Sequence, residues 1–204
     1  MPGSSRPGAV VVAAGASSRM GSPKALLPWG GVPLAEAHVR ALAPWSSGTV
    51  VVLGAGFAEI GAHLPGLWIV ENAVWATSGM IGSIAAGLRA LPPGPAWVVP
   101  VDTAPVAPDV AGALLAAGGP AVPVDPAGNL GHPVLLDAAT VAEILRAPPA
   151  GGLRAILGSA RRVPVGADVA ADFDTPGEYA RMIADGAATP APGARTGAQR
   201  REAT

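Results

Sequence analysis

Short apolar runs rich in valine alternate along the chain with segments whose apolar residues recur at helical spacing. Runs of this kind, separated by helices, indicate βαβ units and a mainly parallel sheet. The predicted strands are 9–14, 49–53, 67–71, 96–101, 121–124, 133–136 and 162–165. The predicted helices are 34–43, 57–63, 80–91, 107–117, 138–146, 153–157 and 176–184.

Two local signals indicate where elements begin and end. Pro100 lies inside the run 96–101 and is expected to mark the end of that strand, because proline donates no ladder hydrogen bond. Thr175 is expected to cap the last helix, with Pro176 in its first turn and Glu178 three residues after the cap. The pattern predicts one α/β domain with a mainly parallel sheet.

The domain is expected to span residues 8–185, with no internal repeat and no second domain. The segment 186–204 is rich in Ala, Pro, Gly and Thr and lacks periodicity, so it is expected to be disordered, as is the segment 1–7. The first residues lack the apolar core of a signal peptide, which makes the cytoplasm the default location.

Composition narrows the classes of function. Hydrophobic residues make up 50% of the 204 residues and charged residues 13%, but no uninterrupted apolar stretch approaches the roughly 20 residues that a membrane-spanning helix needs. A net charge of −1 argues against a broad basic surface for nucleic acid. The chain has no cysteine, which excludes disulfides, thiolate metal sites and cysteine nucleophiles.

Candidate chemistry begins in the loop that follows the first predicted strand. The loop 15–21 consists mostly of small residues and carries Arg19, and Lys24 follows as the only lysine in the chain. Small residues let backbone amides approach phosphate oxygens, and nearby cations offset the phosphate charge. Neither the P-loop nor the dinucleotide-binding glycine pattern fits the loop. From the residues alone, an ordinary turn with Lys24 on a solvated edge stays open.

Three further side chains have two interpretations each. Asp102 follows the strand 96–101, where its carboxylate can either bind Mg²⁺ in the crevice or cap the next helix. Asp174 is by itself a residue favoured near a helix start, and its second interpretation, as a metal ligand, is implied only by the family resemblance described below. Trp75 can stack on a base or pack in the core. His38 and His63 fall in predicted helices, and no function is assigned to them.

The segment Ala13-Ala-Gly-Ala-Ser-Ser-Arg-Met-Gly-Ser-Pro-Lys-Ala-Leu-Leu27 resembles the signature loop of the MobA-like NTP transferase family, in particular its molybdenum cofactor cytidylyltransferases. The resemblance implies a Rossmann-like three-layer sandwich of the nucleotide-diphospho-sugar transferase type. It also implies catalytic roles for Lys24, Arg19 and Asp102. The implied nucleotide-binding residues are Ala13, Ala14, Gly15, Ser17, Arg19, Lys24, Ser78, Gly79 and Ser83.

Other segments extend the resemblance. Residues 72–83 are similar to the Asn-x-x-Trp-x-x-Gly-Met/Leu-x-x-Ser segment of the cytidylyltransferases, which helps to hold the nucleobase. Gly131-His132-Pro133 is similar to their Gly-His-Pro, which implies an acceptor-side role for His132. Residues 172–179 resemble their C-terminal Asp-Ile-Asp-Thr-Pro segment, which makes Asp174 the second ligand and leaves Asp172 structural. The segment 102–105 reads Asp-Thr-Ala-Pro where that branch has Asp-Gln-Pro.

The resemblance implies a transfer of NMP from an NTP, with CTP expected, to a phosphorylated pterin-type acceptor, with release of pyrophosphate. The implied acceptor is the molybdopterin-bound molybdenum cofactor, the implied cofactor is Mg²⁺ on Asp102 and Asp174, and a molybdoenzyme would receive the product. Two alternatives remain. One is a related transferase that uses GTP or another phosphorylated acceptor, and the other is a non-catalytic nucleotide-binding accessory protein for molybdoenzyme maturation.

Overall fold

The computed structural model describes residues 6–187 of the chain. Its centre is a seven-stranded sheet with the strand order β5-β4-β1-β6-β8-β7-β9. In the first half, β1 (Gly8–Ala13) pairs in parallel with β4 (Thr49–Leu53) and β6 (Ala96–Pro100), and β5 (Trp68–Glu71) pairs in parallel with β4. The carboxyl ends of these four strands therefore share one edge of the sheet.

In the second half of the seven-stranded sheet, one strand runs opposite to the other six. The strand β8 (Val134–Leu136) is antiparallel to both β6 and β7 (Ala121–Val124). The strand β9 (Arg161–Pro164) then pairs in parallel with β7 at the edge. A short antiparallel hairpin of β2 (Pro28–Trp29) and β3 (Val32–Pro33) stands apart from this sheet.

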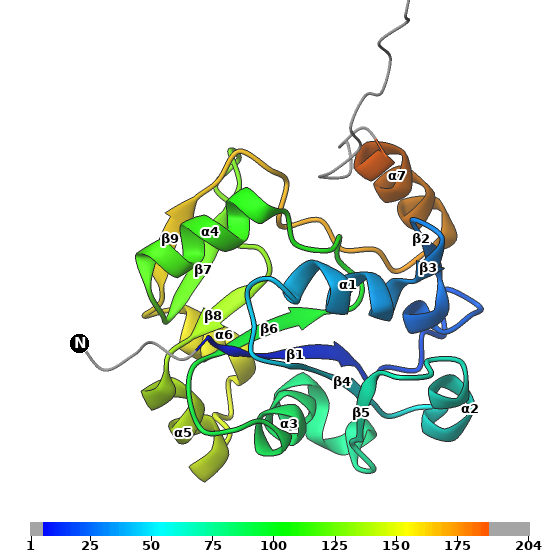
Figure 1. The fold of residues 1–204 in the computed structure, drawn as a ribbon, viewed down its shortest axis with the longest axis horizontal. Coiled ribbons are helices and arrows are strands. Elements are labelled where there is room, and N and C mark those ends of the chain that lie inside the picture. Colours follow the sequence, from blue (N-terminus) through cyan, green and yellow to red (C-terminus); the bar gives the residue numbers. More distant parts are fainter. Residues whose placement is uncertain (1–5, 188–204) are drawn as a thin grey trace, which may run out of the picture.

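Helices cover both faces of the sheet (Figure 1). One face packs against α1 (Leu34–Leu42), α2 (Phe57–Ala62) and α4 (Pro108–Ala117). The other face packs against α3 (Trp75–Ala90), α5 (Ala138–Arg146) and α6 (Gly152–Leu157). The last helix, α7 (Pro176–Ala187), lies near the β2–β3 hairpin, and its Tyr179 hydroxyl donates to the carbonyl of Pro28.

The central strand explains why the sequence reads as continuous apolar runs. Every residue of β1 is buried, with Val10 and Val12 in one core and Ala9 and Val11 in the other. A strand covered on both faces needs apolar residues at every position, as expected for a parallel strand in the middle of an α/β sheet. The three-layer α/β fold predicted from the sequence is therefore confirmed.

The predicted elements are present with small shifts at their ends. Pro100 ends β6 as predicted. The cap of α7 is also confirmed, because Glu178 accepts from the amide of Thr175 at 3.0 Å and its own amide donates to the Thr175 hydroxyl at 3.4 Å. The sequence pattern missed the β2–β3 hairpin, whose two-residue strands are too short to show periodicity.

The helix α3 starts at Trp75 rather than at residue 80. Gly79 lies within it at φ 60° and ψ −167°, outside the helical region. The backbone is therefore interrupted there, and the regular apolar pattern that predicts a helix begins only after this glycine.

The sequence predicts disorder for residues 1–7 and 186–204. Most of these residues lie outside the part of the chain that the structure describes. Of these segments, the structure describes residues 6–7 and 186–187. The carbonyl of the buried Pro7 accepts from the amide of Ser47 at 2.9 Å, and α7 continues to Ala187. Over residues 6–187, no helix combines the length and apolar character needed to cross a membrane.

A matched pair of helical glycines tests the packing of α3 on the sheet. A Cβ at Gly87 would lie 2.5 Å from Val10 and 2.8 Å from Val52, whereas a Cβ at Gly112 of α4 would meet only Trp45 at 3.9 Å. We expect Gly87→Ala to lower the free energy of unfolding by about 1–3 kcal/mol because of overpacking. Gly112→Ala should leave it unchanged or raise it by up to about 1 kcal/mol. Urea denaturation measures both, and equal effects would contradict this packing.

Candidate active site

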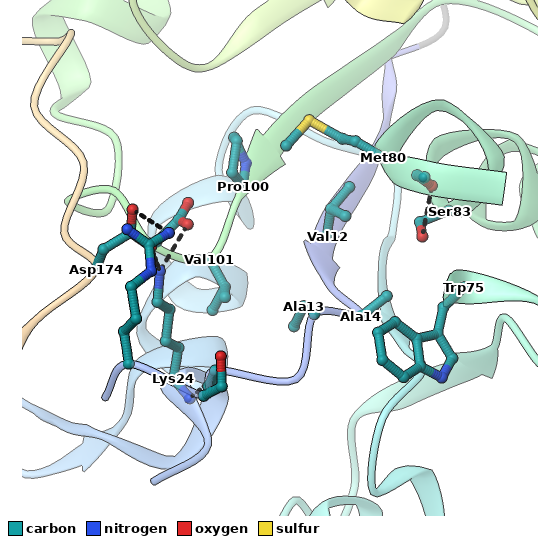
Figure 2. Close-up of a pocket in the computed structure, with 16 residues that line it drawn as sticks. Val12, Ala13, Ala14, Lys24, Trp75, Met80, Ser83, Pro100, Val101 and Asp174 are labelled. Carbon is teal, nitrogen blue, oxygen red and sulfur yellow. Dashed lines mark hydrogen bonds and ion pairs between the residues drawn. The ribbon is translucent and has the colours of Figure 1, made fainter. Parts of the chain in front are cut away.

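A cavity of about 360 Å³ opens at the carboxyl ends of β1 and β6. Ligands of open α/β sheets bind at this edge. In Figure 2, Lys24 and Asp174 lie at one end of the cavity and Trp75 lies at the other, with the end of β1 between them, while the Met80 side chain extends from its helix towards Pro100. The lining residues are Val12, Ala13, Ala14, Gly15, Ser17, Ser18, Arg19, Lys24, Trp75, Gly79, Met80, Ser83, Pro100, Val101, Asp102 and Asp174.

The loop after β1 is folded back so that Lys24 faces the cavity. Ser17 adopts a φ of 52°, a left-handed conformation that is uncommon for a residue other than glycine. In this conformation its hydroxyl accepts from the backbone amide of Lys24 at 3.1 Å, and its carbonyl accepts from the amide of Met20 at 3.0 Å. The short 3₁₀ turn Lys24–Leu26 follows directly. Ser17 thus fixes where the lysine enters the site.

The ammonium of Lys24 lies between two carboxylates. Its Nζ is 3.0 Å from Oδ2 of Asp102 and 2.8 Å from Oδ1 of Asp174. The residue is only 8% exposed, and its Nζ lies 5.3 Å from the ring centroid of the buried Phe173. A thin side chain ending in a compact charge fits this place, whereas the wide fork of an arginine does not match it.

Neighbouring opposite charges favour the ionised forms of Lys24 and Asp174. Burial lowers the pKa of Lys24, but its hydrogen bonds to Asp174 and Asp102 and their negative charges outweigh burial and leave its pKa above the ordinary value. The hydrogen bond from Lys24 lowers the pKa of Asp174, and the charges of Lys24 and Arg19 act in the same direction. Both shifts favour the ionised forms of Lys24 and Asp174 at neutral pH.

Asp174 also contacts the loop after β1. Its Oδ2 lies 2.8 Å from Nη2 of Arg19, whose side chain is 70% exposed. Its backbone amide donates to Oε2 of Glu178 at 2.9 Å, so the cap of α7 holds the residue from the other side. Asp172 is exposed and lies outside the cavity lining.

Asp102 reaches the cavity from the turn after β6. It is separated from α4, which begins at Pro108 with Ala107 as its N-cap, so the helix-cap interpretation of Asp102 is wrong. The carbonyl of Asp102 accepts from the amide of Phe173 at 3.0 Å. This bond joins the turn that carries Asp102 to the segment that carries Asp174.

The far end of the cavity is organised by Asn72, which sequence reasoning mentioned only as part of a motif. Its buried side-chain amide donates to the hydroxyls of Ser78 and Ser83, each at 2.9 Å. The hydroxyl of Ser83 donates in turn to the carbonyl of Gly79 at 3.4 Å. Asn72 therefore holds the two ends of the helix interruption at Gly79 together.

Trp75 forms a wall of the cavity and packs on the backbone behind it. A Cβ at Gly54 would lie 2.5 Å from the Trp75 side chain and 2.6 Å from the carbonyl of Ala14. The indole is thus half-buried against the ends of β1 and β4, while it also lines the cavity. The packing agrees with the core interpretation of Trp75, and stacking on a base stays a prediction.

Most sequence-predicted site residues meet in the cavity lining, but two do not. Ser78 is separated from the lining and binds Asn72 instead. His132 also lies outside the lining. Its ring Nδ1 is buried with no hydrogen-bond partner among the described residues, and burial lowers its pKa while the charge of Asp102 raises it.

The site residues fit a divalent cation that arrives with a nucleotide. Over residues 6–187, no three His, Asp or Glu side chains form a metal-binding group. Asp102 and Asp174 nevertheless approach one atom within 3.0 Å, and both are partly exposed to the cavity. Mg²⁺ in nucleotide sites typically uses one or two carboxylates and completes its coordination with phosphate oxygens and water. The two carboxylates supply such a donor set.

Solved structures share this fold. The Rv0371c homologue from Mycobacterium sp. strain JC1 is 29% identical, with a TM-score of 0.72 over 89% of this chain and 97% of that chain. Rv0371c from Mycobacterium tuberculosis H37Rv, in complex with manganese, is 23% identical, with a TM-score of 0.68 over 88% and 99%. Molybdopterin-guanine dinucleotide biosynthesis protein A from Archaeoglobus fulgidus is 20% identical, with a TM-score of 0.63 over 89% and 100%.

A search of curated proteins finds no match. The family model described as the MobA-like NTP transferase domain matches residues 9–164, which include the loop after β1, the Asn72–Ser83 segment and Asp102. This match covers most of the chain, and it includes most of the residues that line the cavity at the ends of β1 and β6. The chain therefore belongs to the MobA-like NTP transferase family.

Proposed function

We propose that this nucleotidyltransferase moves CMP from CTP to a phosphorylated pterin, the molybdopterin-bound molybdenum cofactor, and releases pyrophosphate. The observation that carries the proposal is the division of one cavity into a charged end and an end with apolar side chains. Ion pairs join Lys24, Arg19 and the two carboxylates at the first end. Trp75 lies at the second end, and the apolar Met80 side chain lines the cavity above the end of β1. A nucleoside triphosphate has the same division between its phosphates and its base.

The charged end suits the triphosphate. Lys24 and Arg19 supply positive charge where negative charge builds during transfer, and the small-residue loop around Gly15 lets backbone amides approach. Asp102 and Asp174 would hold Mg²⁺, which would supply charge neutralisation on the phosphates when bound. The manganese named for the Rv0371c complex supports the use of a divalent ion.

The other end suits a pyrimidine base. Gly79 interrupts the helix at the cavity wall, and the first amides of the following helical segment lack intrahelical acceptors. Those amides and the Ser83 hydroxyl can bind the polar edge of a base, while Trp75 and Met80 contact its faces. Support for cytosine comes from the similarity of residues 72–83 to the cytidylyltransferase segment.

In this proposal, the phosphorylated acceptor binds on the side of the cavity that is nearest to His132. The charge of Asp102 acts on its ring, which relates it to the charged end of the cavity, and its buried Nδ1 has no hydrogen-bond partner within residues 6–187. The Gly131-His132-Pro133 similarity and the molybdopterin named for the Archaeoglobus fulgidus protein support a pterin acceptor. A molybdoenzyme would receive the product.

The reaction needs positioning rather than a covalent protein intermediate. An acceptor phosphate oxygen attacks the α-phosphorus in line and forms a new P–O bond. The bond from the α-phosphorus to the bridging oxygen breaks, and its electron pair leaves with pyrophosphate. Lys24 and Arg19 stabilise the charge on the transferring and leaving phosphates, and Ser17 holds Lys24 in place.

The test of the proposal supplies purified protein and Mg²⁺ with molybdopterin cofactor and each of the four NTPs in turn, and follows pyrophosphate. We expect release with CTP and cofactor together, and little with CTP alone. Selective release with GTP would overturn the base, release with another phosphorylated acceptor only would overturn the pterin, and binding of CTP without release would indicate an accessory protein.

Substitution of Lys24 tests the charged end. Lys24→Ala should reduce turnover roughly 10²–10³-fold, the usual cost of one lost transition-state donor. Lys24→Arg should also be poor, because it replaces a compact ammonium with a wide planar fork. Arg40→Lys is the matched control, since Arg40 forms a surface ion pair with Glu36 away from the cavity, and its turnover should be normal. Full activity of Lys24→Arg would sink the assigned role.

Metal binding without nucleotide gives a second test of the same arrangement. Lys24 lies where an ion shared by Asp102 and Asp174 would have to compete with it. Lys24→Met should therefore bind Mn²⁺ more tightly than the natural protein, whereas Asp102→Asn should bind it more weakly. Titration followed by Mn²⁺ electron paramagnetic resonance measures both, and weaker Mn²⁺ binding by Lys24→Met would exclude this competition.

A further inference from the structure

The turn after β6 contains a buried hydroxyl that the proposed reaction does not use. Thr103 is 5% exposed, and its Oγ1 donates to the carbonyl of Pro100 at 2.9 Å. This bond closes the turn across Asp102, which lies between the two residues. A hydroxyl buried in this way restrains the backbone on both sides of the carboxylate.

The carbonyl of the same threonine is held by a histidine from another layer. His38 of α1 is 1% exposed, and its Nε2 lies 3.1 Å from the carbonyl oxygen of Thr103. Burial lowers the pKa of His38 to about 4, so the ring is neutral and carries one proton near pH 7. Since a carbonyl only accepts, that proton is on Nε2. Its Nδ1 is buried and has no partner over residues 6–187.

The turn is also hydrogen-bonded to the segment that precedes Asp174. The carbonyl of Asp102 accepts from the Phe173 amide at 3.0 Å, and Thr103 forms an isolated antiparallel bridge with Asp172. Phe173 is fully buried and directly precedes Asp174. A displacement of the turn would therefore move both carboxylates that hold the Lys24 ammonium.

We propose that His38 and Thr103 are positioning residues, which set the place of Asp102 relative to Asp174 and Lys24 for nucleotidyl transfer. This inference rests on the proposed function. Neither residue lines the cavity, so each acts through the backbone of the turn. The pair also gives a physical role to the Asp-Thr-Ala-Pro sequence of residues 102–105, because Thr103 supplies both the hydroxyl and the carbonyl that hold the turn.

The first experiment compares the buried hydroxyl of Thr103 with the half-buried hydroxyl of Thr49. Thr103→Val removes the bond to Pro100, whereas Thr49→Val removes a similar bond to Ser46 at the opposite end of the sheet, away from the cavity. We expect Thr103→Val to lower kcat about 10–100-fold with a smaller change in KM for CTP, the usual range for a residue that supports a ligand from behind. Thr103→Ser keeps the hydroxyl and should have a kcat close to that of the natural protein, and Thr49→Val should also have a normal kcat.

His38 is tested by the donor it supplies. His38→Gln keeps an N–H that can reach the carbonyl of Thr103, and His38→Leu does not. We expect kcat of the glutamine variant to exceed that of the leucine variant at least about tenfold. Equal kcat values for the two folded variants, or a normal kcat for Thr103→Val, would overturn the positioning role. Should His38→Leu fail to fold, the threonine series decides alone.

A substrate-free measurement separates this inference from the proposed function. Hydrogen exchange of the Phe173 amide, followed by NMR, reports its bond to the carbonyl of Asp102 directly. Exchange should accelerate at least about tenfold in Thr103→Val and stay unchanged in Thr49→Val. If the natural protein transfers no nucleotide, the proposed function fails while this arm still tests the turn. Unchanged exchange in Thr103→Val would refute the inference even in an active enzyme.

Discussion

The ammonium of Lys24 joins three segments that are far apart in the sequence. Asp102 lies 78 residues and Asp174 lies 150 residues from the lysine along the chain, yet both carboxylates contact its one Nζ atom. The contacts are compatible only if the loop after β1, the turn after β6 and the segment before α7 hold their relative places. The left-handed Ser17, the Phe173 bond to Asp102 and the Glu178 cap each fix one of those segments.

The sheet supplies the frame for this contact. Val12 of β1 pairs with Pro100 of β6 in a parallel register, so the two strands end side by side. The loop with Lys24 and the turn with Asp102 then start next to each other, and short connections suffice to bring their side chains together. The buried valines of β1, packed in both cores, give these strand ends little freedom to shift.

The fold and the charged end of the cavity were largely predictable from the sequence, for different reasons. Strands covered on both faces must be apolar throughout, so their valine runs are visible without any tertiary information. The roles of Lys24, Asp102 and Asp174 came from resemblance, and the structure brings their side chains together.

His38 was missed because its contact with Thr103 crosses 65 residues of sequence. Its spacing with Leu34 and Leu42 on one helical face could have indicated that it points inward. The links from Asn72 to Ser78 and Ser83 depend on an irregular backbone at Gly79, which periodicity does not describe.

The position of the Trp75 indole in the cavity wall depends on the glycine behind it. Gly54 has no side chain, and the indole of Trp75 occupies the room this leaves against the end of β1. A Cβ at position 54 would lie 2.5 Å from the Trp75 side chain and 2.6 Å from the carbonyl of Ala14, so a larger residue would have to displace the indole or the end of β1. A glycine behind the wall thus limits how far the indole extends into the cavity, although Gly54 is not itself among the lining residues.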